Sequence, residues 1–220
     1  MNVAVVIPSY NAAVSLPELL ERTLAVISKE KIIVVNDGST DQTRETAGRI
    51  GVKVISHEHN KGKGAALQTG FQYVLQNDFD AVITMDADLQ HQPEEIPNFI
   101  SCHSKGNRDI IIGNRLHNTA GMPVHRLLSN TLTTAMVRLR TGAIIKDSQS
   151  GFRFITRRVL EKISVRSEGF EAETEFLIKA AAAGFSFDAI PIATIYAGEK
   201  SNMKHVRTTM NFIKVLLKQY

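Results

Sequence analysis

Short apolar segments alternate with helix-like segments along nearly the whole chain, and this alternation is the strongest constraint on the fold. Strands are predicted at residues 3–7, 31–35, 52–56, 80–85, 109–113, 151–155 and 185–192. Helices are predicted at residues 17–27, 41–48, 62–76, 93–101, 123–138, 159–163, 171–183 and 203–220. This order predicts an α/β fold with a mostly parallel sheet covered by helices on both faces. Pro191 favours a position near the sheet edge for the last strand.

No internal repeat, linker or low-complexity segment interrupts the 220 residues, so we expect one domain over residues 1–220 with a helix at about 203–220. The single cysteine, Cys102, has no partner for an internal disulfide. The N-terminal sequence lacks the basic start and long apolar core of a signal peptide, and the longest apolar runs are too short to span a bilayer. We therefore expect a cytoplasmic protein that meets a membrane, if at all, from its surface.

The two halves of the chain differ in charge. Residues 1–110 carry 10 Lys and Arg against 14 Asp and Glu, whereas residues 111–220 carry 16 against 8. A basic half is typical of a protein with an anionic partner such as a phosphate, a lipid surface or nucleic acid, although solvated helix faces explain it equally well. Nucleic acid is disfavoured, because aromatic residues are not interleaved with the basic ones.

Four polar segments follow predicted strands: PSYN, NDGSTD, HEHNKGKG and DADLQH. Ligands of parallel sheets bind beyond the carboxyl ends of the strands, so these segments are expected to converge on one binding edge. Asp37 in NDGSTD could accept a hydrogen bond from a nucleobase N–H. The glycines and lysines of NKGKG could approach a phosphate, but a tight turn before a helix explains them as well.

The sharpest motif is DAD, in which Asp86 and Asp88 stand one residue apart at the end of an apolar strand. Two like charges so close repel each other unless a cation lies between them. Carboxylate oxygens at this spacing suit a hard divalent ion such as Mg²⁺ or Mn²⁺, whose open positions a diphosphate can fill. The motif therefore predicts a metal site that binds a diphosphate, with Gln90 and His91 beside it.

Taken together, IPSYN, VVNDGSTD, NKGKGAA, DADLQHQPEE, GNR and DSQSGFR resemble in order and spacing the inverting glycosyltransferases of family 2, which have the GT-A fold. The chain is most similar to the dolichol- and polyprenyl-phosphate mannose (hexose) synthase branch. The resemblance covers roughly residues 3–200. DADLQH with the later SGFR is specific to that branch, whereas PSYN and NDGS mark only the broader family.

The resemblance implies a role for several residues by position. The residues implied to bind the nucleotide sugar are Pro8, Tyr10, Asp37, Asp86, Ala87 and Asp88. Those implied to bind the Mg²⁺ or Mn²⁺ ion are Asp86, Asp88 and Gln90. The residues implied to bind the acceptor phosphate are Arg115, Arg126 and Ser129, and the implied catalytic residues are Asp88, Arg115 and Arg153. Three departures concern the base and the acceptor: Ala12 replaces a usual Glu, Asn114 replaces a frequent Ser, and YAGEKSN has no preceding arginine.

The implied function is metal-dependent, inverting transfer of a hexose from a nucleoside-diphosphate sugar to an acceptor, expected to be a polyprenyl phosphate. GDP-mannose and UDP-glucose both fit as donors, and the oligomeric state stays open. A soluble or saccharide acceptor is an alternative and would need a general base, for which Asp147, Glu171 and Glu173 are candidates. The residues also leave open a non-catalytic nucleotide-sugar-binding module and a nucleotidyltransferase. A nucleotidyltransferase usually has a basic, glycine-rich loop after its first strand, which IPSYNAAVS lacks.

The C-terminal segment has apolar residues at helical spacing. Val206, Met210, Ile213 and Leu217 form a stripe that Phe212 and Leu216 widen, and the surrounding cations are Lys204, Arg207, Lys214 and Lys218. Such a helix can lie in a membrane interface with its cations near anionic lipid. It can equally pack on its own domain. With a polyprenyl-phosphate acceptor, the first possibility predicts peripheral contact with the cytoplasmic face of a membrane.

Overall fold

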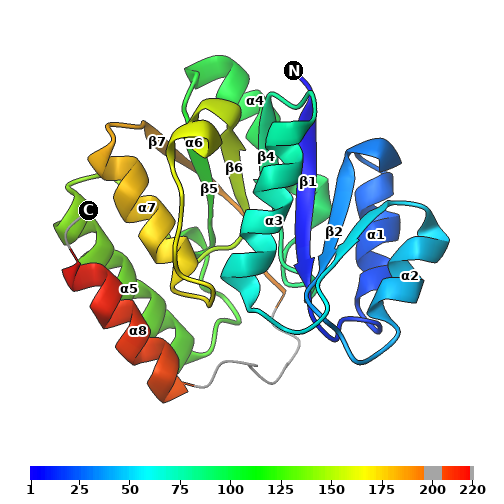
Figure 1. The fold of residues 1–220 in the computed structure, drawn as a ribbon. Helices are drawn as coiled ribbons and strands as arrows, with labels where there is room; N and C mark the ends of the chain where they lie inside the picture. The colour runs from blue at the N-terminus through cyan, green and yellow to red at the C-terminus, as the bar shows by residue number, and fades with distance from the viewer. Residues whose placement is uncertain (196–204, 219–220) are drawn as a thin grey trace.

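The computed structural model describes residues 1–195 and 205–218, and in that part of the chain seven strands form one sheet (Figure 1). The strands are β1 Val3–Ser9, β2 Ile32–Asn36, β3 Lys53–Ser56, β4 Ala81–Thr84, β5 Ile110–Asn114, β6 Arg153–Thr156 and β7 Phe187–Pro191. Their order in the sheet is β3-β2-β1-β4-β6-β5-β7. Each predicted strand overlaps an observed one, and the predicted edge position of the last strand is confirmed.

One strand reverses the otherwise parallel sheet. β6 pairs antiparallel with both β4 and β5, and Arg153 at its start is opposite Thr84 on one side and Ile112 on the other. The start of an antiparallel strand lies where its parallel neighbours end. The SGFR segment is thereby brought to the carboxyl edge of β4, next to the DAD segment that follows that strand.

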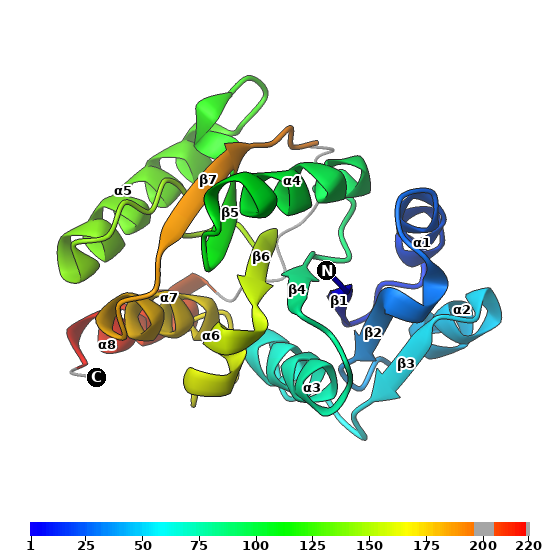
Figure 2. The ribbon, with the colours of Figure 1, turned by 90° about the horizontal axis from the view of Figure 1, so that it is seen from above.

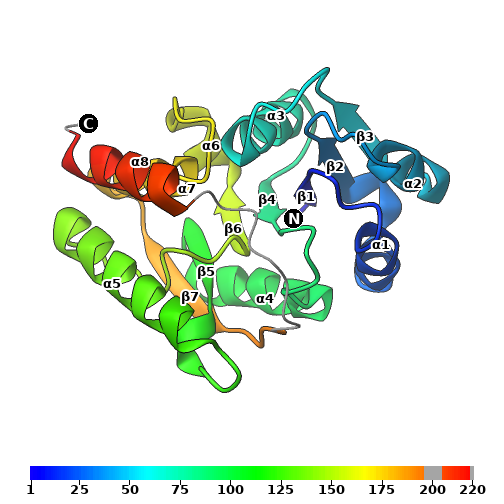
Figure 3. The same ribbon diagram turned by 90° about the horizontal axis from the view of Figure 1, so that it is seen from below.

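Helices cover both faces of the sheet (Figure 2). One face packs against α1 Leu16–Leu24, α2 Thr43–Ile50 and α4 Ile96–Gly106, and the other against α3 Lys63–Gln76, α6 Arg157–Lys162 and α7 Ala172–Ala182. The helices α5 Val124–Thr141 and α8 His205–Leu217 lie at the β7 end of the molecule, packed against α7 (Figure 3). Short 3₁₀ turns lie at Lys29–Lys31, Pro93–Glu95 and Arg115–His117.

The central strand β1 is apolar on both faces, as a strand covered by helices on both sides must be. Val3, Val5 and Ile7 join the core under α1, while Ala4 and Val6 join the core under α3. Burying each large side chain contributes roughly 1.5–3 kcal/mol. On α3, Gly70 allows a close approach to β1, since a Cβ there would lie 2.4 Å from Cγ1 of Val6.

The C-terminal helix packs on the domain along part of its apolar stripe. Phe212 and Leu216, which were expected to widen a membrane-facing stripe, are instead buried in the core shared by α7 and α5. Met210, Ile213 and Leu217 are exposed. The side chains of Val206 and Arg207, and all of Lys204, lie outside the described residues. In the described residues, every helix is too short or too polar to cross a bilayer.

Candidate active site

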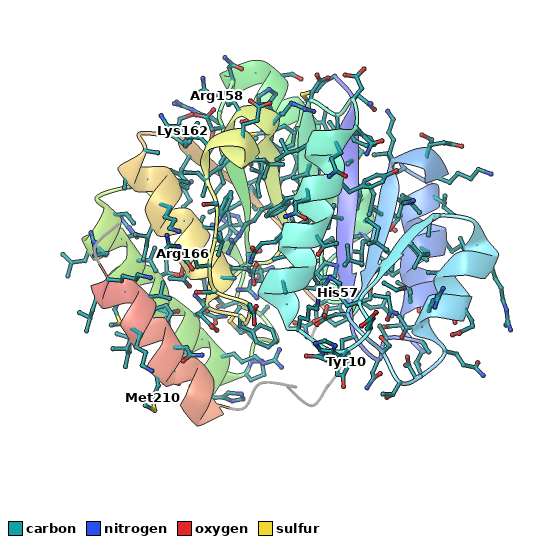
Figure 4. All side chains as sticks on the ribbon, viewed as in Figure 1. Tyr10, His57, Arg158, Lys162, Arg166 and Met210 are labelled. Atoms are coloured by element: carbon teal, nitrogen blue, oxygen red, sulfur yellow. The ribbon has the colours of Figure 1, made fainter. Side chains whose placement is uncertain are left out.

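Polar loops gather at the lower end of the sheet in Figure 4, where β1, β2 and β4 end and β6 begins. Tyr10 from the loop after β1 and His57 from the loop after β3 both lie at this end. The expected convergence of the four polar segments therefore occurs at the edge where ligands of such sheets bind.

Asp86 is held by two cationic or polar side chains. Its Oδ1 lies 2.6 Å from Nζ of Lys63, and its Oδ2 lies 3.8 Å from Nε2 of His91, which is buried. Burial alone would raise the pKa of Asp86, but Lys63 and His91 outweigh it and hold the pKa well below its usual range. Asp86 is therefore an anion whose present counter-ion is a lysine from the NKGKG loop.

The pKa of Asp88 is shifted in the direction opposite to that of Asp86. Its Oδ1 accepts a hydrogen bond from the backbone N–H of Gln90 at 3.0 Å. Burial, and then the charge of Asp86, raise the pKa of Asp88. A second cation at this place would relieve the repulsion, so the pair fits a divalent ion. In the described residues no three His, Cys, Asp or Glu side chains form a metal-binding cluster, so further ligands would have to come from elsewhere.

Lys63 also links the carboxylate pair to helix α7. Its ammonium lies 2.8 Å from Oε2 of Glu173, and Glu173 in turn lies 3.7 Å from Nη2 of Arg153. Burial alone would lower the pKa of Lys63, but Asp86 and Glu173 outweigh it and raise that pKa. The sequence pattern indicates only a phosphate-approaching loop here. A lysine in the first turn of a helix after a glycine-rich loop is the signal that could have marked Lys63 as a site residue.

Arg153 is buried, and its guanidinium organises the segment before β6. It donates hydrogen bonds to the carbonyl oxygens of Ser150 at 2.7 Å, Ser148 at 2.9 Å and Glu173 at 3.2 Å. The glycine of SGFR, Gly151, lies against the carboxylate, because a Cβ there would be 2.5 Å from Oδ2 of Asp86. In this structure Arg153 shapes the wall behind the carboxylates.

Arg115 forms a bidentate ion pair with Asp147. Its Nε and Nη2 donate to the two carboxylate oxygens of Asp147 at 2.8 and 3.0 Å, and its backbone N–H donates at 3.2 Å. Burial alone would raise the pKa of Asp147, but the hydrogen bonds from Arg115 outweigh it and lower that pKa. Asp147, a candidate base from sequence, is thus the positioning partner of Arg115.

The other two residues expected at the acceptor phosphate lie on α5. Nη1 of Arg126 donates to Oε1 of Gln90 at 3.4 Å, which brings α5 to the segment that carries the two aspartates. Ser129, one turn further along the helix, is exposed. The expected acceptor and metal regions are therefore neighbours.

Two residues expected to bind the nucleotide, Tyr10 and Asp37, differ in exposure. Tyr10 is exposed, as a ring that stacks on a base must be. Asp37 is buried, and it accepts hydrogen bonds from His57 at 2.6 Å and from the backbone N–H groups of Lys61 and Gly62 at 2.9 and 2.8 Å. The carboxylate therefore holds the loop that leads to Lys63, a role that its position after a strand did not reveal.

Of the remaining residues expected at the nucleotide, Pro8 lies in β1 and Ala87 in the loop after β4. Pro8 is in β1, opposite Val35 of β2. The carbonyl oxygen of Ala87 accepts a hydrogen bond from the hydroxyl of Ser15 at 2.6 Å. This bond joins the DAD loop to the start of α1, so that both loops form one wall of the site.

Comparison with known proteins matches this chain to one family. The sequence model of the family described as "Glycosyl transferase family 2" matches residues 4–164. An uncharacterized protein of Methanocaldococcus jannaschii is 32% identical over 99% of this chain and 90% of its own length. The polyprenol monophosphomannose synthase of Mycolicibacterium smegmatis is 32% identical over 86% of this chain and 75% of its own length.

Two further proteins extend the comparison. The dolichol-phosphate mannosyltransferase of Pyrococcus furiosus is 35% identical over 81% of this chain, and the match spans 53% of that enzyme's length. Glucosyl-3-phosphoglycerate synthase from Mycobacterium tuberculosis, solved with Mn²⁺, UDP and glucosyl-3-phosphoglycerate, has a TM-score of 0.77 at 21% identity and covers 98% of this chain and 78% of its own. At that identity the structural match shows the fold alone, which is the expected GT-A fold.

Proposed function

Because the chain belongs to glycosyl transferase family 2, we propose that it transfers a hexose from a nucleoside-diphosphate sugar to a polyprenyl phosphate, with inversion at the anomeric carbon. Residues 1–220 act as one catalytic domain in this proposal. The observation that carries it is the contact between Arg126 and Gln90, since it joins the cations expected to bind the acceptor to the loop of the two aspartates. The relatives named for transfer to dolichol or polyprenol phosphates support the acceptor class.

On the donor side, Asp86 and Asp88 would hold the Mg²⁺ or Mn²⁺ ion, with Gln90 beside them. When bound, such an ion acts as a Lewis acid that stabilises negative charge on the departing diphosphate. Tyr10 would stack on the base, and the wall formed by Ala87 and Ser15 would confine the diphosphate. The ammonium of Lys63, now on Asp86, adds positive charge where the diphosphate would lie.

On the acceptor side, Arg115 and Arg126 would attract and orient the lipid phosphate. Asp147 fixes the guanidinium of Arg115, so its donors are pre-oriented. A phosphate monoester has a second pKa of about 6, so its oxygen is already ionised at neutral pH and needs no base.

Each of the three acidic residues considered as bases already has a side-chain partner. Asp147 is paired with Arg115, and Glu173 with Lys63 and Arg153. Glu171 accepts a hydrogen bond from Nδ2 of Asn211 on α8 at 3.3 Å. For Asp147, the lowered pKa reduces its basicity, which disfavours proton abstraction from a sugar hydroxyl and favours a phosphate nucleophile.

The direct test is transfer itself. We would incubate the protein with GDP-mannose, UDP-glucose or UDP-N-acetylglucosamine and Mg²⁺ or Mn²⁺, with and without a polyprenyl phosphate in detergent. The expected result is nucleoside-diphosphate release that depends on the polyprenyl phosphate, together with a lipid-linked hexose of inverted configuration by NMR. The Asp88→Asn variant serves as the inactive control. Release that is independent of the lipid but stimulated by a soluble sugar or sugar acid would contradict the acceptor assignment.

A further inference from the structure

Helix α5 exposes a continuous apolar stripe on its outer side. Val124, Leu128, Leu132 and Leu139 are 63–89% exposed. Their spacing of four, four and seven residues aligns them along one side of a helix, and the exposed Ala135 lies between the last two. Four large apolar side chains in one row are more than the scattered exposed residues that a soluble surface normally carries.

The opposite side of α5 is already used for the fold. Thr134 and Val137 are buried, and Val137 belongs to the core under α7 and α8. Among the described residues, no helix or strand packs on the outer stripe. The helix is therefore apolar on two sides, and only one of them is explained by the domain.

The surroundings of the stripe are cationic. The sequences of α5 and α8 contain no Asp or Glu. Exposed cations near this surface are Arg138 and Arg140 on α5, Lys214 on α8 and Lys218 directly after α8. Arg140 donates hydrogen bonds to the carbonyl oxygens of Leu216 at 3.2 Å and Lys218 at 3.1 Å, which fixes the end of α8 beside the end of α5. On α8, Met210 lies on the outer side (Figure 4), and Met210, Ile213 and Leu217 are exposed.

We propose that the outer face of α5, flanked by α8, docks on an anionic lipid bilayer. The apolar stripe enters the head-group boundary, and the basic side chains around it face anionic head groups. Charge complementarity selects this occupant. A second copy of the chain would bring two basic faces together, which like-charge repulsion opposes.

This inference rests on the proposed function and deepens it by naming the surface on which the lipid acceptor is met. Arg126 contacts Gln90, while Leu128, two residues further along, is exposed on the opposite side of the helix. A helix is about 10–12 Å wide with its side chains. An acceptor phosphate drawn to Arg126 would then lie about one helix width from the bilayer that holds its isoprenoid chain.

The docking test compares charge substitutions on exposed apolar residues. The double variant Leu128→Glu/Leu132→Glu is expected to reduce co-sedimentation with vesicles of phosphatidylcholine containing phosphatidylglycerol at least fivefold. Met210→Glu/Leu217→Glu is expected to reduce it less, because α5 carries the longer stripe. Val14→Glu is the matched control, since Val14 is 95% exposed at the start of α1 on another part of the surface. It should leave vesicle binding unchanged. Near-ultraviolet circular dichroism checks that each variant is folded.

Salt and lipid composition provide the second arm of the test. Vesicle binding by the wild-type protein should fall with added salt and with removal of phosphatidylglycerol. The reason is that part of the binding is electrostatic attraction to anionic head groups, which salt screens. Wild-type protein that stays in the supernatant at low salt would overturn the proposal. A wild-type dimer that the Leu128→Glu/Leu132→Glu variant converts to a monomer, without vesicle binding by either, would overturn it in favour of a second copy.

Failure of docking and failure of the proposed function give different results. With a short-chain, water-soluble prenyl phosphate and no vesicles, Leu128→Glu/Leu132→Glu should transfer sugar as fast as wild type. With a long-chain polyprenyl phosphate in vesicles, its transfer should fall in parallel with its binding. Wild-type protein that binds vesicles but transfers to neither acceptor contradicts the proposed function alone. A variant slow with the long-chain acceptor yet bound to vesicles as tightly as wild type contradicts the docking surface alone.

Discussion

The ammonium of Lys63 lies 2.6 Å from Oδ1 of Asp86, so the first carboxylate of the DAD motif is neutralised by the protein's own cation. A divalent ion that uses this oxygen must compete with Lys63. We predict that Lys63→Met raises Mn²⁺ affinity in the absence of nucleotide by about tenfold, or 1.4 kcal/mol. This change is smaller than the interaction energy of roughly 4 kcal/mol between two unit charges 4 Å apart near a protein surface.

Isothermal titration calorimetry with Mn²⁺ alone measures this effect without any turnover. Lys61→Met, on the same loop, is the control, and it should leave Mn²⁺ affinity close to that of wild type. Weaker Mn²⁺ binding by Lys63→Met would show that the lysine holds Asp86 in place for the metal and does not compete with it.

Asp88 is predicted to lower the stability of the fold while serving the site. A carboxylate whose pKa is raised by folding has its ionised form disfavoured in the folded state, so at neutral pH its charge destabilises the protein. Asp88→Asn should raise the free energy of unfolding by on the order of 1 kcal/mol, which is about 2–4 °C in Tm for a chain of this size. Nucleoside-diphosphate release should fall by roughly 100-fold or more. A variant with lowered Tm would instead show that Asp88 stabilises the empty site.

Much of the fold follows from local pattern. Segments such as Val3–Ile7 and Ile110–Gly113 are short, apolar and bounded by polar turns, and the structure has strands at both. The reversal of β6 has no local signal, because its apolar pattern is the same in either direction. What sets it is pairing with strands far away in the sequence, where Arg153 is opposite both Thr84 and Ile112.

The site could be predicted by position but not by contact. The DAD motif placed Asp86 and Asp88 at the carboxyl edge of β4, and the structure has them directly after that strand. The resemblance implied Arg126 at the acceptor, and in the structure it contacts Gln90, two residues after Asp88. Which charges pair depends on distances across the fold, so Asp147 read as a possible base although it binds Arg115. For the same reason, the burial of Phe212 and Leu216 could not be read from a stripe that suits a bilayer and a core equally well.

The Arg115–Asp147 pair should make stability depend on acid. Folding lowers the pKa of Asp147, so its contribution is present above the unfolded pKa of about 3.9 and is lost as pH falls through the lower folded pKa. Asp147→Asn should lower the free energy of unfolding by about 3 kcal/mol at pH 7, because it leaves the largely buried guanidinium of Arg115 without its anion. In urea titrations, the difference in free energy of unfolding between Asp147→Asn and wild type should become smaller below about pH 4. A constant difference from pH 7 to pH 3 would mean that the loss is one of packing and not of charge.

Gly151 of SGFR should be required for metal binding through its lack of a side chain. A Cβ at this position would lie 2.5 Å from Oδ2 and 2.9 Å from both Cγ and Oδ1 of Asp86, closer than non-bonded atoms approach. Gly151→Ala must therefore displace the Asp86 carboxylate, and we predict at least tenfold weaker Mn²⁺ binding by calorimetry. The overpacking should also destabilise the fold, by about 1–3 kcal/mol.

Two further glycine substitutions separate this local effect from general destabilisation. Gly70→Ala also creates a clash, since its Cβ would lie 2.4 Å from Cγ1 of Val6, but this site is in the core away from Asp86. It should lower the free energy of unfolding while the folded protein binds Mn²⁺ with wild-type affinity. At Gly48 a Cβ would meet no heavy atom within 4 Å apart from those of its own stretch of helix, so Gly48→Ala should stabilise helix α2 by about 0.5–1 kcal/mol and leave Mn²⁺ binding unchanged. If Gly151→Ala and Gly70→Ala weakened Mn²⁺ binding equally, the contact between Gly151 and Asp86 would have no special part in holding the metal.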